Sequence, residues 1–103
     1  MRWLLHLVLP LLCAACASPA PEFRGIESVR LNRGGRDFLL YRSADRAEII
    51  RLGPASRAER DLLEPLMRRL MEEETGCRII RGTALGESGE LRARLRCPAN
   101  GPP

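Results

Sequence analysis

The chain has 103 residues, which is enough for one small domain and too few for two. Its 17 basic residues are all arginine and are set against 13 acidic residues, so the chain is mildly basic. The single histidine, His6, lies in an apolar N-terminal run and lysine is absent, so the rest of the chain lacks both usual nitrogen bases for proton transfer and nucleophile activation. These features argue against an enzyme, a metal site and a bound cofactor.

The N-terminal segment has the pattern of a cleaved export signal. Arg2 precedes an apolar run over residues 3–12, and small side chains then lead to Cys16. Because a spanning helix needs about 20 apolar residues, this run is too short to cross a membrane. The pattern predicts a signal peptide over residues 1–15.

The end of the signal resembles that of bacterial lipoproteins. Ala14 and Ala15 precede Cys16 as in that family, although Cys13 stands where the family usually has an aliphatic residue. The resemblance implies diacylglycerol on the Cys16 thiol, cleavage before this residue and acylation of the new amino terminus. It further implies a lipid-anchored protein of the cell envelope that faces the periplasm, and Ala17 and Ser18 indicate the outer rather than the inner membrane. Cleavage elsewhere by ordinary signal peptidase is the alternative.

Residues 16–25 are predicted to be a lipid-anchored tether, because two prolines and several small residues disfavour regular structure there. Fully extended at about 3.3 Å per residue, this tether reaches about 30 Å, so the domain works close to its membrane. A single domain is expected over residues 26–98, followed by a disordered tail over residues 99–103. An exported domain is not expected to bind nucleic acid.

Three strands are predicted first in the domain. Residues 26–33 and 36–42 flank Gly34-Gly35, which suits a two-residue hairpin turn with positive φ. In that register Leu31 faces Phe38, and Val29 faces Leu40. A third strand over residues 47–52 is expected to return through residues 44–46. Leu40 then meets Ile50, and Arg42 meets Glu48.

A helix is predicted over residues 56–75. Ser56 and Glu59 have capping-box spacing, and Thr75-Gly76 is typical of a helix end. Pro65 should either bend the helix or divide it. Apolar residues recur every three or four positions and predict one broad face, which consists of Leu62, Leu63, Leu66, Met67, Leu70 and Met71.

A final hairpin is predicted from residues 77–83 and 91–97, with its turn near residues 86–89. Its register places Cys97 opposite Cys77 and Leu91 opposite Thr83. The export signal implies an oxidising compartment, so Cys77 and Cys97 are expected to form a disulfide. A metal site would need more ligands, and a redox pair would need CxxC spacing.

Together these elements predict an α+β fold. It is a small two-layer sandwich in which an antiparallel sheet of four or five strands, in the chain order β-β-β-α-β-β, carries one helix on one face. The sequence leaves open whether the final hairpin joins the sheet beside the first or the third strand.

The function expected from these features is that of a membrane-anchored protein-interaction or assembly module, whose partner is an envelope protein or a second copy. On the predicted registers, an apolar cluster rimmed by arginine lies on the sheet face away from the helix. The alternative is a binder of an anionic envelope molecule, such as a lipid headgroup or polysaccharide, through rows of arginine. The candidate interaction residues are Leu39, Tyr41, Ile49, Ile80, Arg51 and Arg94.

Overall fold

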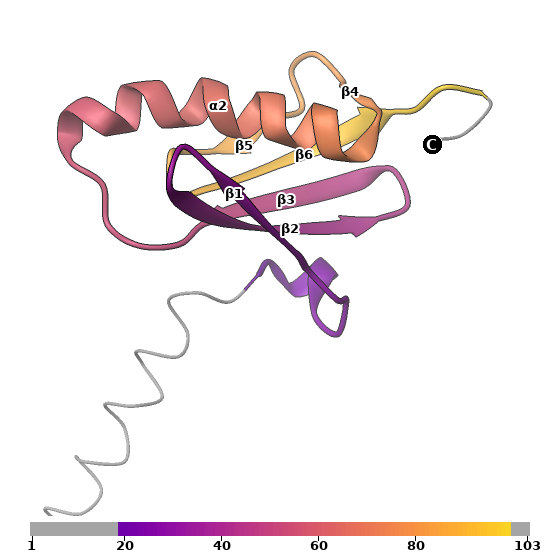
Figure 1. The fold of residues 1–103 in the computed structure, drawn as a ribbon. Coiled ribbons are helices and arrows are strands. Elements are labelled where there is room, and N and C mark those ends of the chain that lie inside the picture. The colour runs from indigo at the N-terminus through magenta and orange to yellow at the C-terminus, as the bar shows by residue number, and fades with distance from the viewer. Residues whose placement is uncertain (1–18, 100–103) are drawn as a thin grey trace, which may run out of the picture.

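The structure is a computed structural model that describes residues 19–99 (Figure 1). The predicted signal peptide, Cys16 and residues 100–103 of the predicted tail lie outside this range. Within the described range, no helix is both long enough and apolar enough to cross a membrane.

The described chain forms strands, then one α-helix, then strands, as the sequence predicts. A single sheet has the order β1-β2-β3-β6-β4, with the short β5 also paired to β6, and every pairing is antiparallel. The α+β prediction is therefore confirmed, and the final hairpin joins the sheet beside β3. The elements are η1 (Pro21–Phe23), β1 (Val29–Arg33), β2 (Arg36–Ser43), β3 (Arg46–Arg51), α2 (Arg57–Thr75), β4 (Arg78–Ile79), β5 (Leu85–Gly86) and β6 (Glu90–Arg96).

The first hairpin has the predicted register. Gly34 and Gly35 adopt φ values of 63° and 77°, which a glycine pair accommodates without a Cβ clash. Leu31 consequently pairs with Phe38 across β1 and β2.

The predicted register between β2 and β3 is wrong by one residue. Leu40 pairs with Ile49 instead of Ile50, because the turn contains only Ala44 and Asp45. Ala44 adopts a left-handed φ of 54°, which closes the tight turn without a glycine. Since side chains alternate between faces, this shift exchanges the faces on which Ile49 and Ile50 lie.

The helix begins and ends as predicted. The Glu59 N–H donates to Ser56 Oγ at 3.2 Å, and the Ser56 N–H donates to Glu59 Oε1 at 3.0 Å. Gly76 ends the helix at φ 70°, and its N–H donates to the Glu72 carbonyl at 2.9 Å. Pro65 lies inside one continuous helix, so it does not divide the element.

The core lies between α2 and one face of the sheet (Figure 1). Leu62 was expected to belong to the apolar helix face, but 73% of it is exposed. It is rotated by roughly 100° about the helix axis from the buried Leu63, which takes it away from the sheet. The buried core residues are Phe38, Leu40, Ala47, Ile49, Leu63, Met67, Leu70, Met71, Cys77, Leu91, Ala93 and Leu95.

The last hairpin follows its predicted register only at one end. Ile79 pairs with Leu95 as expected, but Leu91 pairs with Gly86 and not with Thr83. The Thr83 hydroxyl donates to the Ile80 carbonyl at 2.7 Å and accepts the Arg94 N–H at 3.1 Å. This side chain holds the chain between β4 and β5 in a loop, which changes the register beyond it.

Candidate functional site

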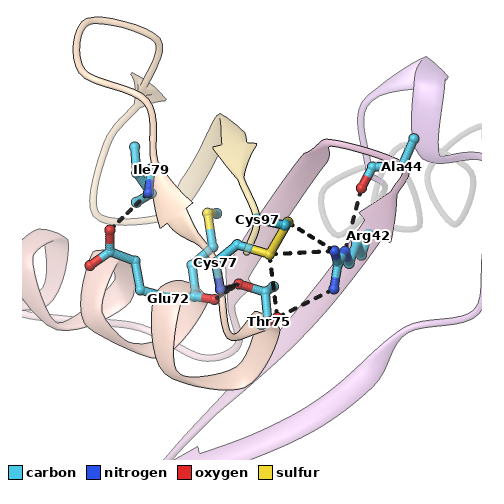
Figure 2. Close-up of a disulfide and its surroundings, with 8 residues drawn as sticks. Arg42, Ala44, Glu72, Thr75, Cys77, Ile79 and Cys97 are labelled. Carbon is cyan, nitrogen blue, oxygen red and sulfur yellow. Dashed lines mark hydrogen bonds between the residues drawn. A yellow bond between two sulfur atoms is a disulfide. The ribbon is translucent and has the colours of Figure 1, made fainter. Parts of the chain in front are cut away.

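The predicted disulfide joins Cys77 to Cys97, with their Cα atoms 4.3 Å apart (Figure 2). Thr75 supports it from the end of α2, because its hydroxyl donates to the Met71 carbonyl at 2.7 Å and accepts the Cys77 N–H at 3.2 Å. The bond thus ties the last turn of the helix to the end of β6. Its role in the fold is that of a structural cross-link.

The sheet face opposite α2 is partly covered by the N-terminal segment, residues 20–23, which we call the strap (Figure 1). Phe23 has no exposed surface, and its ring centroid lies 6.4 Å from that of Tyr41. The Ala20 N–H donates to Glu48 Oε1 at 2.9 Å. Part of the predicted tether is therefore packed on the sheet.

The predicted interaction face does not form as expected. Ile49 is fully buried against α2, and Leu39 and Tyr41 are half-buried on the opposite face. The cause is the shifted register between β2 and β3, which moves Ile49 into the core.

Arg51 also leaves the predicted face, because it pairs with Phe38 on the helix side. Its guanidinium donates to the carbonyls of Ser88 at 2.7 Å and Gly53 at 3.1 Å. Partial burial, followed by the nearby positive charges of Arg36 and Arg60, lowers the pKa of this group. Arg51 thus joins two loops and is not part of a free arginine row.

Ile80 and Arg94 remain accessible, and each lines a different pocket. Ile80 belongs to an open pocket of about 310 Å³ at the edge of the sheet, which we call the edge pocket. Its lining residues are Arg78, Ile79, Ile80, Arg81 and Arg96.

The edge pocket combines an apolar floor with unbalanced positive charge. Arg78 and Arg96 pair directly across β4 and β6, where like charges repel. Among the described residues, no carboxylate forms an ion pair with Arg78, Arg81 or Arg96. Three exposed guanidinium groups are therefore available to an outside anion.

Part of the backbone at this edge of the sheet already has a hydrogen-bond partner. β4 is the last strand in the sheet, and the Ile79 N–H donates to Glu72 Oε2 at 2.8 Å (Figure 2). Because a side chain of α2 already accepts from Ile79, a partner would bind the edge pocket through side chains and not by adding a strand.

A second open pocket, of about 370 Å³, lies beside the strap, and we call it the face pocket. Here the arginines are paired: Arg46 with Glu22 at 3.1 Å, Arg92 with Glu90 at 2.9 Å and Arg94 with Asp45 at 3.2 Å. Its lining residues are Glu22, Arg46, Gly82, Thr83, Leu85, Arg92, Ala93 and Arg94.

Glu48 is the buried acidic residue beneath the strap, with only 1% of its surface exposed. Its pKa is raised to about 7, first by burial and then by the neighbouring Glu90 carboxyl, whereas the Ala20 N–H and the charge of Arg92 oppose this shift. The sequence analysis does not identify this residue, because the predicted register pairs Glu48 with Arg42. In the structure Glu48 pairs with Tyr41, on the face that the strap covers.

The described residues contain no cluster of three or more His, Cys, Asp or Glu side chains that could hold a metal ion. Comparisons of the chain with protein-family models, curated proteins and solved structures find no match. The edge pocket and the face pocket are therefore identified as candidate sites from the side chains that line them, and not from a related protein.

Proposed function

We propose that this chain is a lipid-anchored protein of the bacterial cell envelope that docks another envelope protein through its edge pocket. The lipoprotein-like signal and Cys16 support an anchor facing the periplasm, with the outer membrane favoured by Ala17 and Ser18. The disulfide fits an oxidising compartment.

The observation that carries the docking proposal is the set of three unpaired arginines around two isoleucines. Protein interfaces commonly place arginine around a buried apolar centre, and arginine binds carboxylates in bidentate geometry. The repulsion between Arg78 and Arg96 would be relieved by an acidic partner. The partner surface that fits therefore carries Asp or Glu beside an apolar side chain.

Anchoring is tested by metabolic labelling with a fatty-acid analogue. The wild-type chain should carry the label and Cys16→Ser should not. Equal labelling of the two chains would contradict the anchor.

Docking is tested by placing a photo-crosslinking residue at Arg81 in the edge pocket and, as a control, at Arg60 on α2. Illumination of living cells should give a discrete protein adduct at position 81 and none at position 60. Ile80→Ser should reduce the yield if the partner is a protein with an apolar contact.

Variants of the edge pocket distinguish a protein partner from the alternative, an anionic envelope molecule. Such a molecule would be held by the arginines alone, so Arg78→Gln with Arg96→Gln would abolish its binding while Ile80→Ser would leave it unchanged. Strong weakening by salt would also favour this alternative.

A further inference from the structure

The strap restricts where a lipid on Cys16 can lie. Ala20 is hydrogen-bonded to Glu48 on β3, and Phe23 is buried beside Tyr41, so the strap leaves the domain from the face opposite α2 (Figure 1). Only four peptide units separate Cys16 from Ala20. At about 3.3–3.6 Å per residue these units span at most about 14 Å.

The short span determines which surface meets the membrane. A 30 Å tether would let the domain turn freely, but a connection of at most about 14 Å to one face holds that face near the lipid. This step rests on the lipid anchor proposed above. The face opposite α2 is then the side nearest the bilayer.

The face pocket lies on that side, next to the point where the strap leaves. Glu22 belongs to the strap and also lines the pocket, so the anchor and the pocket are contiguous. Three arginines and the hydroxyl-bearing Thr83 line the pocket, and Leu85 at its rim is 63% exposed. Cationic and hydroxyl donors with one exposed apolar side chain suit the headgroup region of a bilayer.

The existing ion pairs do not prevent this contact. The Arg46 and Arg94 side chains and their acidic partners are each about half exposed, and such surface pairs are worth only about 0–1 kcal/mol. A lipid phosphate offers the same bidentate geometry as the carboxylate that it replaces. A bilayer surface presents many phosphates together, which favours the exchange.

We propose that the sheet face opposite α2 is the membrane-facing side of the domain, and that Arg46, Arg92 and Arg94 in the face pocket bind the phosphate headgroups of anionic phospholipids. The helix α2 is thereby directed away from the bilayer. The edge pocket lies further along β6, around Arg96, and shares only this strand with the face pocket.

Orientation is measured on the chain 16–103, with the Cys16 thiol coupled to a maleimide-bearing phospholipid in bilayer nanodiscs that contain phosphatidylglycerol. Because the anchor is supplied chemically, the result does not depend on acylation in the cell. A lipid with a gadolinium-chelating headgroup should attenuate the amide signals of Arg24, Gly82, Leu85 and Arg94, and leave those of Arg60 and Arg68 on α2 intact.

The variant Arg46→Gln/Arg94→Gln should weaken the attenuation at Gly82, Leu85 and Arg94 without shifting it to α2, because the short connection to Cys16 is unchanged. The wild-type chain in nanodiscs of phosphatidylcholine alone should behave in the same way. The matched control Arg33→Gln/Arg68→Gln also removes two exposed ion pairs and two charges, but on the helix side, and should behave like the wild type. An unchanged Phe23 signal in both variants would show that the strap stays packed.

Attenuation that is equal on both sides, or stronger on α2, would overturn the proposed orientation. Attenuation that is as strong in Arg46→Gln/Arg94→Gln as in the wild type would overturn the role of these arginines. A failure of fatty-acid labelling at Cys16 in cells would instead contradict the anchor, and the nanodisc result would still report on the face.

Discussion

Arg42 lies against the disulfide, with Nη2 3.2 Å from Sγ of Cys97 and 3.4 Å from Sγ of Cys77 (Figure 2). Its Nη1 donates to the Thr75 carbonyl at 3.4 Å. Arg42 therefore joins β2 to the end of α2 and to the last strand. The Glu48 carboxylate that the sequence assigned to it lies on the opposite face of the sheet.

The disulfide should be a large part of the stability of this domain. It closes a loop with a sequence separation of 20 residues, for which chain entropy gives a stabilisation of about 3 kcal/mol. Cys77→Ala/Cys97→Ala should lower the free energy of urea unfolding by about that amount. A reductant should destabilise the wild type and leave the double variant unchanged; equal stability of the two oxidised chains would contradict this role.

Ile49 and Leu62 should respond in opposite ways to the same polar change. Ile49 has no exposed surface, so Ile49→Ser should cost at least about 3 kcal/mol, because it leaves a cavity and a buried hydroxyl. Leu62 is 73% exposed, and Leu62→Ser should change the stability by less than about 0.5 kcal/mol. Thermal unfolding of both variants measures the difference. If the Ile49→Ser domain folds with unchanged stability, this result would support the register predicted from the sequence, in which Ile49 lies outside the core.

Phe23 should belong to the folded unit although it precedes the first strand. Its side chain is fully buried, so Phe23→Ala should lower the free energy of unfolding by about 3–5 kcal/mol. Hydrogen exchange should also become faster at Ile26, whose N–H donates to the Phe23 carbonyl. Arg24→Ala, at the exposed neighbouring position, serves as the control. Unchanged stability of Phe23→Ala would mean that the strap contributes nothing to the fold.

Glu48 should make the stability depend on pH. Its folded-state pKa is raised from 4.5 to about 7, so the folded chain holds a proton that the unfolded chain releases in this window. The free energy of unfolding should therefore fall as pH rises from 4.5 to about 7. Glu48→Gln stays neutral and still offers an acceptor to Ala20, so it should flatten this slope.

The control for this measurement is Glu64→Gln, which removes the carboxylate of an exposed ion pair on α2. Its stability should keep the wild-type dependence on pH. If the slope of Glu48→Gln equals that of the wild type, another group is responsible for it.

The sequence predicts an element well where one local signal determines its geometry. Gly34-Gly35 permits the tight turn that sets the register of the first hairpin, and the Ser56 and Glu59 side chains satisfy the free amides at the start of α2. The order of the elements and the cysteine pairing followed from such signals.

The register of β3 had no such signal. Ile49 and Ile50 are consecutive apolar residues, so either of them satisfies a pattern with one face buried. The turn that decides between them depends on Ala44 in a left-handed conformation, which the Cβ of alanine disfavours, so the sequence does not predict it. The predicted interaction face was wrong for the same reason.

The burial of Phe23 depended on a contact between distant parts of the chain. Phe23 lies in a proline-containing segment with no periodic pattern, and its position follows from the apolar and acidic side chains of β2 and β3 beneath it. An aromatic residue among small and polar residues indicates that its side chain is buried. It does not indicate which surface of the domain buries it.

The hydrogen bond from the Ile79 N–H to the Glu72 carboxylate bears on how neighbouring chains meet. With the lipid anchor proposed above, neighbouring chains would diffuse in the plane of one membrane and would meet there. An open edge strand would let such collisions grow into a continuous sheet between molecules. In β4, which has only two residues, the Glu72 carboxylate already accepts the outward-facing N–H of Ile79. A strand of a neighbouring chain therefore cannot pair with that N–H.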